Sequence, residues 1–189
     1  MNDKKDYPAL FKPGLHRKTL SQLRHITVDK FPESHRRRSI FAAVCEIHRT
    51  LTHHGIPCRM FIDGSFSTEK QEPGDADIVC EFRNDDITTL PLNARQVLQW
   101  ACAGEHHLDD RCHLFGYVTY PKSHALHQLS RGYQDYWMDF FSHGRDRSPK
   151  GLPFIEVSNR STIQSRGTGA ALTSHPRLVS TFPRSWRAT

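Results

Sequence analysis

Two aspartates, Asp75 and Asp77, are the residues whose type and spacing most directly suggest chemistry. They stand at the start of an apolar segment, and a Gly64-Ser65 dipeptide precedes them at the end of another. Because side chains two residues apart on a strand point to the same face, both carboxylates can converge on one cation. Carboxylate and phosphate oxygens are the ligands that Mg²⁺ prefers. The spacing therefore predicts a magnesium site with Asp75 and Asp77 as ligands.

The Gly64-Ser65 dipeptide is expected to bind phosphate. A helix beginning there would aim free backbone N–H groups at an anion, and only glycine lets the backbone approach so closely. Ser65 could donate to a phosphate or help to hold the metal, and it could also be the N-cap of the following helix. Asp63 could reach the metal or fix the turn, and we favour the turn. Together these residues predict a site for a nucleoside triphosphate with a metal.

The order of these motifs resembles the nucleotidyltransferase superfamily, whose members share a polymerase-beta-like catalytic core. Its signature is an apolar residue, Gly, then Gly or Ser, and after a gap an Asp-x-Asp flanked by apolar residues. Asp63-Gly64-Ser65 and Asp75-Ala76-Asp77-Ile78-Val79 match it here, although Asp63 stands where an apolar residue is commoner. The resemblance implies that Asp75 and Asp77 are catalytic and bind one or two Mg²⁺.

The chain is also similar to a mostly uncharacterised family of small prokaryotic proteins of this type. This similarity covers roughly residues 7–157 and rests on sequence blocks in the same order. The blocks are Pro13-Gly14-Leu15-His16, Gly64-Ser65-Phe66, Pro73-Gly74-Asp75-Ala76-Asp77, Tyr136-Trp137, Asp146-Arg147 and Pro149-Lys150-Gly151. It implies that Arg147 and Lys150 contact the phosphates of the nucleotide or the acceptor. A surface turn in which Asp146 pairs with an arginine is the alternative.

Two further sets of cations could bind phosphates. Lys70 lies on the loop between the two halves of the motif, where it could neutralise a triphosphate or be an ordinary solvated lysine. His35-Arg36-Arg37-Arg38 stands at an expected helix start, where the helix dipole disfavours cations. Those arginines either bind phosphates or pair with neighbouring acids.

One position departs from the superfamily pattern. Active members carry a third carboxylate on a later central strand, beside the first two. The corresponding strand is expected at residues 113–120, and His113 stands where the acid should be. Asp109 and Asp110 could substitute only if the strand begins earlier. Losing one carboxylate removes a negative charge from a two-cation site, so the resemblance leaves catalytic activity open.

Three functions follow from these observations. The first is a Mg²⁺-dependent nucleotidyltransferase that moves a nucleoside monophosphate from NTP to an RNA, protein or small-molecule acceptor, for example as a toxin or defence component. Its nucleotide-binding residues would be Gly64, Ser65, Lys70, Arg147 and Lys150. The second is a catalytically degenerate protein that binds nucleotide or nucleic acid. The third is an antitoxin-like interaction partner, which an exposed aromatic patch at residues 133–141 would favour; aromatic residues at helical spacing are more often core.

The composition sets outer limits. At 189 residues the chain is most naturally one domain, and no apolar run approaches the length of a membrane span. The five cysteines show no Cys-x-x-Cys spacing, which is typical of reduced thiols in a cytoplasmic protein. Most of the net charge of +6 comes from arginines after residue 158, where no acidic residue occurs. That tail is either a basic arm for nucleic acid or a dispensable extension.

Strands alternating with helices predict an α/β (α+β) fold, a mixed sheet packed with helices. Strands are expected at residues 58–63, 77–82, 113–120 and 153–157, and helices at 19–31, 34–55, 93–103 and 123–141. The superfamily core has the same order. We expect an extended N-terminal arm over residues 1–16, a nucleotidyltransferase-like domain over 17–158, and a basic, disordered tail over 159–189.

Overall fold

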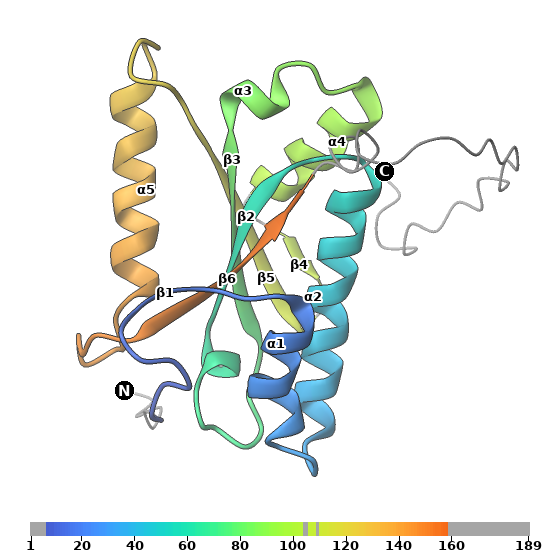
Figure 1. Ribbon diagram of the computed structural model, residues 1–189, viewed down its shortest axis with the longest axis vertical. Coiled ribbons are helices and arrows are strands. Elements are labelled where there is room, and N and C mark those ends of the chain that lie inside the picture. The colour runs from blue at the N-terminus through green and yellow to red at the C-terminus, as the bar shows by residue number, and fades with distance from the viewer. Residues whose placement is uncertain (1–6, 104–105, 109, 159–189) are drawn as a thin grey trace, which may run out of the picture.

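The fold is built on a six-stranded mixed sheet with strand order β1-β6-β2-β3-β5-β4 (Figure 1). The computed structural model describes residues 7–103, 106–108 and 110–158. The strands are β1 (Gly14–Arg17), β2 (Cys58–Asp63), β3 (Ala76–Arg83), β4 (His106–Leu108), β5 (Cys112–Thr119) and β6 (Gly151–Val157). The pairs β1–β6 and β3–β5 are parallel, and the other neighbours are antiparallel. The predicted mixed sheet is confirmed.

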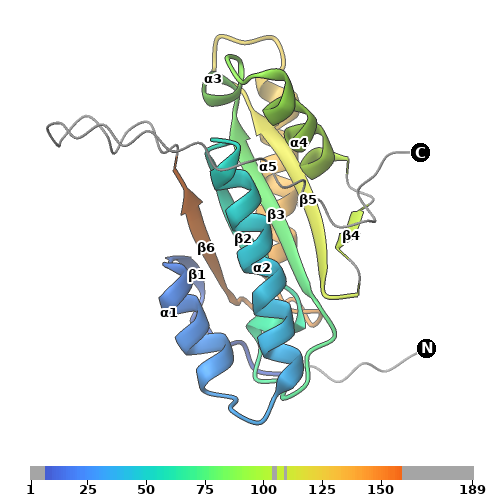
Figure 2. The same cartoon turned by 90° about the vertical axis from the view of Figure 1, so that its right-hand side faces the viewer.

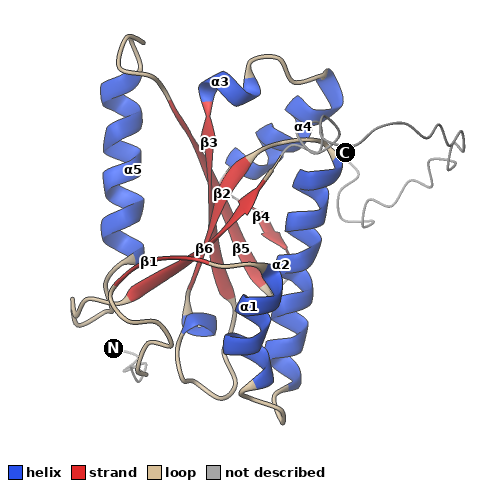
Figure 3. Cartoon of the chain, viewed as in Figure 1, coloured by secondary structure: helices blue, strands red, loops and turns tan. Residues whose placement is uncertain are grey.

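Helices cover both faces of this sheet. They are α1 (Leu20–Arg24), which continues into the π-helical turn η1 (His25–Asp29), α2 (His35–His53), the 3₁₀ turn η2 (Ser65–Ser67), α3 (Asn84–Ile87), α4 (Leu92–Cys102) and α5 (His127–Phe141). Helices α1, α2 and α4 lie on one side of the sheet and α5 lies on the other (Figures 2 and 3). The sheet therefore has one face towards α2 and one towards α5.

Helix α2 shows how the sequence specifies one of these layers. The Ser34 side chain accepts a hydrogen bond from the backbone N–H of Arg37, which caps the helix as predicted. Its apolar residues recur every three or four positions and are fully buried: Ile40, Val44, Ile47 and Leu51. Burying each such side chain contributes about 1.5–3 kcal/mol. The helix ends before Gly55, whose φ of +63° suits glycine.

Strands β2 and β3 are buried on both faces. Ile62 and Ile78 belong to the larger core cluster, beneath α1, α2 and α4. Phe61 and Val79, one residue away along each strand, belong to a second cluster that includes Phe141 of α5. Because neighbouring residues of a strand alternate between faces, Asp63 and Asp77 share the α5 face with Phe61 and Val79.

The part of the N-terminal arm that the structure describes, residues 7–16, joins the sheet. Strand β1 pairs with β6, and the backbone N–H of Leu10 donates to the carbonyl of Ser67 at 3.0 Å. The arm crosses so close to Gly151 that an added Cβ would lie 2.1 Å from the carbonyl oxygen of Lys12. A larger residue at position 151 would therefore displace the arm.

Other differences from the predicted elements are small. Helix α5 begins at His127, four residues later than predicted, because residues 122–126 form turns after Pro121. The predicted tail lies outside the described residues, as does Gly104, the expected end of α4. The five cysteines form no disulfide. Within the described part of the chain, no helix has the length and apolar character needed to cross a membrane.

Candidate functional site

Three polar residues form a row across adjacent strands on the α5 face. Asp63 ends β2 and is the register partner of Asp77 in β3, which is in turn the partner of His113 in β5. Partners on neighbouring strands point to the same face, so these side chains lie side by side. Asp75, just before β3, and Lys150, just before β6, join them. We call these five residues the acidic site.

His113 contacts both aspartates of the Asp-x-Asp motif. Its Nδ1 lies 3.1 Å from Oδ1 of Asp77, and its Nε2 lies 3.6 Å from Oδ2 of Asp75. The three side chains are each about one-third exposed, at 30–34%. Asp75 and Asp77 thus both contact His113, at different nitrogens of its ring. Both carboxylates remain open to solvent.

The carboxyl of Asp77 has a raised pKa, chiefly because it is buried. The neighbouring Asp75 raises this pKa further. His113 and Lys150 act in the opposite direction without reversing the shift. A pair of carboxylates in this condition is stabilised by an added cation.

Asp63 has a cation of its own. Its side chain is only 5% exposed, and Nζ of Lys150 lies 2.8 Å from its carboxylate. The Ser67 hydroxyl also donates to it, at 3.0 Å, which fixes the turn as the sequence suggested. Burial raises the pKa of Asp63, and Lys150 partly offsets that shift. The sequence offered one signal for this pair, which is an acid standing at a position where apolar residues are commoner.

Gly64 is required by both its conformation and its neighbours. Its φ is +80°, and an added Cβ would lie 2.9 Å from Oδ2 of Asp77. The residues after it form only the three-residue turn η2, so the expected phosphate-binding helix at Gly64-Ser65 is wrong. Ser65 is not an N-cap either, because its hydroxyl accepts from the backbone N–H of Gly74 at 3.0 Å. What remains is a backbone turn beside Asp77 and a hydroxyl that contacts the backbone of Gly74 and Asp75.

Arg37 is not accessible to a phosphate, because it is buried and both its terminal nitrogens donate to backbone carbonyls, although its buried Nε has no hydrogen-bond partner. The side chain is fully buried, and its Nη1 donates to the carbonyls of Thr27 and Phe66 at 2.8 and 3.0 Å. Its Nη2 donates to the carbonyls of Thr68 and Lys70. Burial lowers its pKa to about 10. Arg37 therefore holds the segment that follows Gly64-Ser65.

Arg36 links the two segments that lead into the acidic site. Its Nε donates to the carbonyl of Gly74 at 3.0 Å, and its Nη1 lies 2.9 Å from a carboxylate oxygen of Asp110. Because Asp110 is 79% exposed and β5 begins only at Cys112, Asp110 does not replace the third carboxylate. Asp109 lies outside the described residues. His113 thus occupies the expected place of that carboxylate.

Two of the predicted phosphate-binding residues, Arg147 and Lys70, have no hydrogen bond or ion pair from their side chains to the acidic site among the described residues. Arg147 is 70% exposed and pairs with Asp139 of α5, at 3.1 Å. Lys70 is held through its backbone, since its carbonyl accepts from Arg37 and its N–H donates to Thr68. Among the described residues, no hydrogen bond or ion pair joins the ammonium of Lys70 to the acidic site.

The donor set fits a magnesium ion that arrives with phosphates. In the part of the chain that the structure describes, no group of three or more His, Cys, Asp or Glu side chains is arranged to hold a metal. Mg²⁺, however, is usually bound through one or two carboxylates together with substrate phosphates and water. Asp75 and Asp77 supply such a pair, and Gly64-Ser65 adjoins it.

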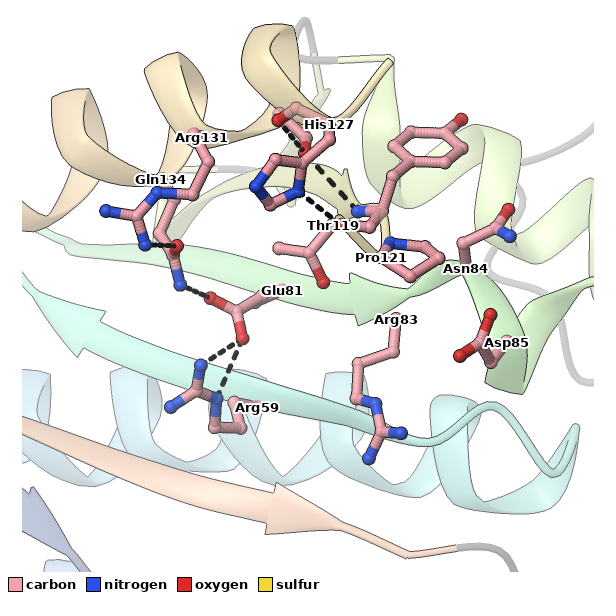
Figure 4. A pocket seen from close by; sticks show the side chains of 12 residues that line it. Arg59, Glu81, Arg83, Asn84, Asp85, Thr119, Pro121, His127, Arg131 and Gln134 are labelled. Carbon is pink, nitrogen blue, oxygen red and sulfur yellow. Dashed lines mark hydrogen bonds and ion pairs between the residues drawn. The ribbon is translucent and has the colours of Figure 1, made fainter. Parts of the chain in front are cut away.

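A second polar cluster lies at the other end of the same sheet face (Figure 4). Glu81 is only 4% exposed, and its carboxylate accepts from the Tyr117 hydroxyl at 2.7 Å, from Nε2 of Gln134 at 3.0 Å and from Nε of Arg59 at 2.8 Å. We call these four residues the Glu81 cluster. Arg59, Glu81 and Gln134 line a hollow of about 380 Å³. Sequence reasoning missed this cluster, and none of the predicted site residues lines the hollow.

The comparisons with known proteins support a family but no activity. A family model described only as a family of unknown function (DUF6932) matches residues 4–157, which include the whole acidic site. Neither the curated proteins nor the solved structures contain a match. Because the match covers most of the chain, this protein belongs to the DUF6932 family of unknown function.

Proposed function

We propose that the acidic site binds a nucleoside triphosphate together with Mg²⁺, and that the protein is a nucleotidyltransferase. The observation that carries this proposal is the convergence of two solvent-open carboxylates with a glycine turn. Gly64 lies so close to Asp77 that an added Cβ would lie within 3 Å of its carboxylate. Phosphates bound at the turn would therefore share their counter-ion with Asp75 and Asp77.

The roles of the residues follow from this arrangement. Asp75 and Asp77 would hold Mg²⁺, which when bound neutralises the charge of the phosphates. Gly64 and Ser65 would cradle the β- and γ-phosphates, and Lys150 would add positive charge beside them. An acceptor hydroxyl would attack the α-phosphorus in line, with pyrophosphate leaving, so that positioning supplies most of the catalysis. RNA, protein and small molecules are the acceptor classes to test.

One observation favours a second function, which is nucleotide binding without transfer. His113 takes the place of the third carboxylate and contacts both aspartates. Asp63, the nearest other acid, is already paired with Lys150. A degenerate nucleotide-binding or nucleic-acid-binding protein would keep Asp75 and Asp77 and lack the third negative charge.

Both functions require nucleotide binding. Isothermal titration of the four nucleoside triphosphates, with and without Mg²⁺, tests for it. We expect Mg²⁺-dependent binding that Asp75→Asn/Asp77→Asn abolishes. The matched control is Asp85→Asn/Asp86→Asn, which also removes two carboxylates but on α3. Equal binding by both variants, or no binding by the wild type, would contradict the proposal.

Label transfer separates the two functions. Wild-type protein is incubated with nucleoside triphosphates labelled at the α-phosphate and with RNA, protein or metabolite fractions. A nucleotidyltransferase attaches the label to one fraction and releases pyrophosphate, and Asp75→Asn/Asp77→Asn does neither. Binding without transfer to any fraction would favour the degenerate protein.

A further inference from the structure

Helix α5 carries an apolar stripe that the rest of the described chain does not cover. Five large apolar side chains, each 43–59% exposed, lie on this helix or at its N-cap: Leu126, Leu129, Tyr133, Tyr136 and Phe140. Their spacing alternates between three and four residues, which is the pattern of a helix–helix seam. We call these five residues the α5 stripe.

The stripe is distinct from the face that packs on the sheet. Trp137 and Phe141 pack into the second core cluster, and Ser130 is buried at the N-terminal end of the helix. Leu129, Tyr136 and Phe140 each stand one position before one of these inward residues, so at 100° per residue the stripe is turned away from the inward face. A helix that packs against one neighbour normally has one apolar face. The second apolar face of α5 therefore indicates a second packing partner.

Gly132 supports close approach of that partner. It lies inside an exposed part of α5, where glycine costs about 1 kcal/mol relative to alanine. No other atom lies within 4 Å of where its Cβ would be, so contacts within the chain do not explain it. It is adjacent to Tyr133, the middle residue of the stripe.

We propose that the α5 stripe binds the α5 stripe of a second copy of this chain, in antiparallel orientation. The two ends of the stripe differ in size, since Leu126 and Leu129 stand at one end and the stacked rings of Tyr136 and Phe140 stand at the other. Antiparallel pairing centred on Tyr133 places each leucine against an aromatic ring of the other copy. The leucines then face aromatic rings at both ends of the seam, and Gly132 leaves room for the two tyrosines at its centre.

The charges of α5 are already paired within the chain. Asp135 pairs with Arg131 at 3.2 Å, and Asp139 pairs with Arg147 at 3.1 Å. The stripe itself contains no charged residue, so pairing leaves no charge unpaired in the seam.

The size of the stripe predicts a weak dimer. From Leu126 to Phe140 it is about 21 Å long at 1.5 Å per residue. Five half-exposed side chains bury on the order of 500 Å² per copy, so roughly 1,000 Å² in total, the lower limit of a specific interface. We therefore expect association in the micromolar range rather than a permanent dimer.

Sedimentation velocity at concentrations from about 1 to 500 μM tests the surface, a range chosen around the expected micromolar affinity. The wild type should shift from monomer to dimer, and Tyr136→Glu should weaken association at least tenfold. Leu92→Glu is the matched control, because Leu92 is an exposed apolar residue on α4. A wild type that stays monomeric, or association equally sensitive to both changes, would overturn the proposal. A monomer would leave the stripe to another protein or to a segment of this chain outside the described residues.

Cysteine crosslinking tests the orientation. Tyr133→Cys should crosslink to its own copy on mild oxidation, because the centre of an antiparallel seam brings identical residues within disulfide reach. Leu126→Cys should not crosslink, since its copy lies about 21 Å away. The wild type with its five cysteines gives the background. Crosslinking through Leu126→Cys alone would overturn the antiparallel arrangement.

Discussion

The acidic site and the Glu81 cluster are two rows across the same three strands, and they differ in how their charges are satisfied. Asp63, Asp77 and His113 form one row, and Arg59, Glu81 and Tyr117 form the other, four residues farther along each strand. Both rows face α5, and the apolar side chains of Phe61, Val79 and Phe115 lie between them. The backbone environment of the two rows is thus closely matched.

Their charges are not matched. The Glu81 cluster balances one carboxylate against one guanidinium, and a hydroxyl and an amide also donate to Glu81. The acidic site has three carboxylates and one ammonium, and the pKa of Asp77 is raised because burial and Asp75 outweigh its cationic neighbours. A closed network stabilises the fold, whereas an excess of carboxylates open to solvent is a binding site for a cation. The comparison predicts different effects for matched substitutions.

Glu81→Ala should cause a large loss of stability. It leaves the buried Tyr117 hydroxyl and the half-buried Arg59 without their acceptor, and an unsatisfied buried polar group costs about 1–3 kcal/mol. Thermal unfolding should show a fall in Tm of about 2–4 °C per kcal/mol for a chain of this size. Glu156→Ala, which removes a carboxylate from an exposed pair with Arg17, should change Tm little. Equal effects of the two changes would contradict a structural role for the Glu81 cluster.

Lys150→Met should destabilise the protein by about 2–3 kcal/mol, because it leaves the buried carboxylate of Asp63 without its cation. The expected loss should largely be recovered by Asp63→Asn in the same chain, since the double variant has no unpaired charge. Chemical denaturation of the wild type, both single variants and the double variant measures the coupling. Additive losses would show that the pair does not stabilise the fold.

Asp77→Asn should increase stability at neutral pH. The folded-state pKa of Asp77 lies above its ordinary value of 3.8, because burial disfavours the charged form. The folded protein therefore holds this proton more tightly than the unfolded chain. The free energy of unfolding therefore falls as the pH rises from the unfolded-state pKa of Asp77 to its folded-state pKa. It stays lower at every pH above both values. Unfolding measured from pH 7 down towards 3.8 should show the gain of Asp77→Asn shrinking, and a constant gain would contradict this cause.

His113→Asp should have its most informative effect on binding. It supplies the carboxylate that the superfamily pattern has at this position, beside Asp75 and Asp77. We expect Mg²⁺-dependent nucleotide binding to tighten by about threefold to tenfold, or up to 1.4 kcal/mol. His113→Asn is the control, because it removes the imidazole without adding charge. Equal binding by both variants would show that the missing charge does not limit the site.

The sequence predicted the elements that depend on local pattern. Strand β2 has the predicted bounds, and α2 begins at its Ser34 cap. Strands β1 and β4 were not predicted because each has only three or four residues, too few for a period to show. The start of α5 was misplaced because turns after Pro121 precede it.

The site was predictable only in part, because a sequence shows local patterns and does not show contacts between distant residues. The spacing of Asp75 and Asp77 predicted that they would share a strand face, but Asp75 stands just before β3, and what the two share is a contact with His113. The Asp63–Lys150 pair joins residues 87 positions apart, and no local pattern specifies it. Likewise, Arg37 was expected as a surface or phosphate-binding cation, and only the fold shows that four carbonyls surround it.

The central claim is that the acidic site binds Mg²⁺ with a nucleoside triphosphate and that the Glu81 cluster does not. Ligand-induced stabilisation tests it directly, because a ligand at a hundred times its Kd raises the unfolding free energy by about 2.7 kcal/mol. The Tm of the wild type, of Asp75→Asn/Asp77→Asn and of Glu81→Gln is measured with and without Mg²⁺ and each triphosphate. We predict an increase for the wild type and for Glu81→Gln, whatever the starting Tm of that variant, and none for Asp75→Asn/Asp77→Asn. An increase that survives Asp75→Asn/Asp77→Asn, or that Glu81→Gln abolishes, would contradict the account.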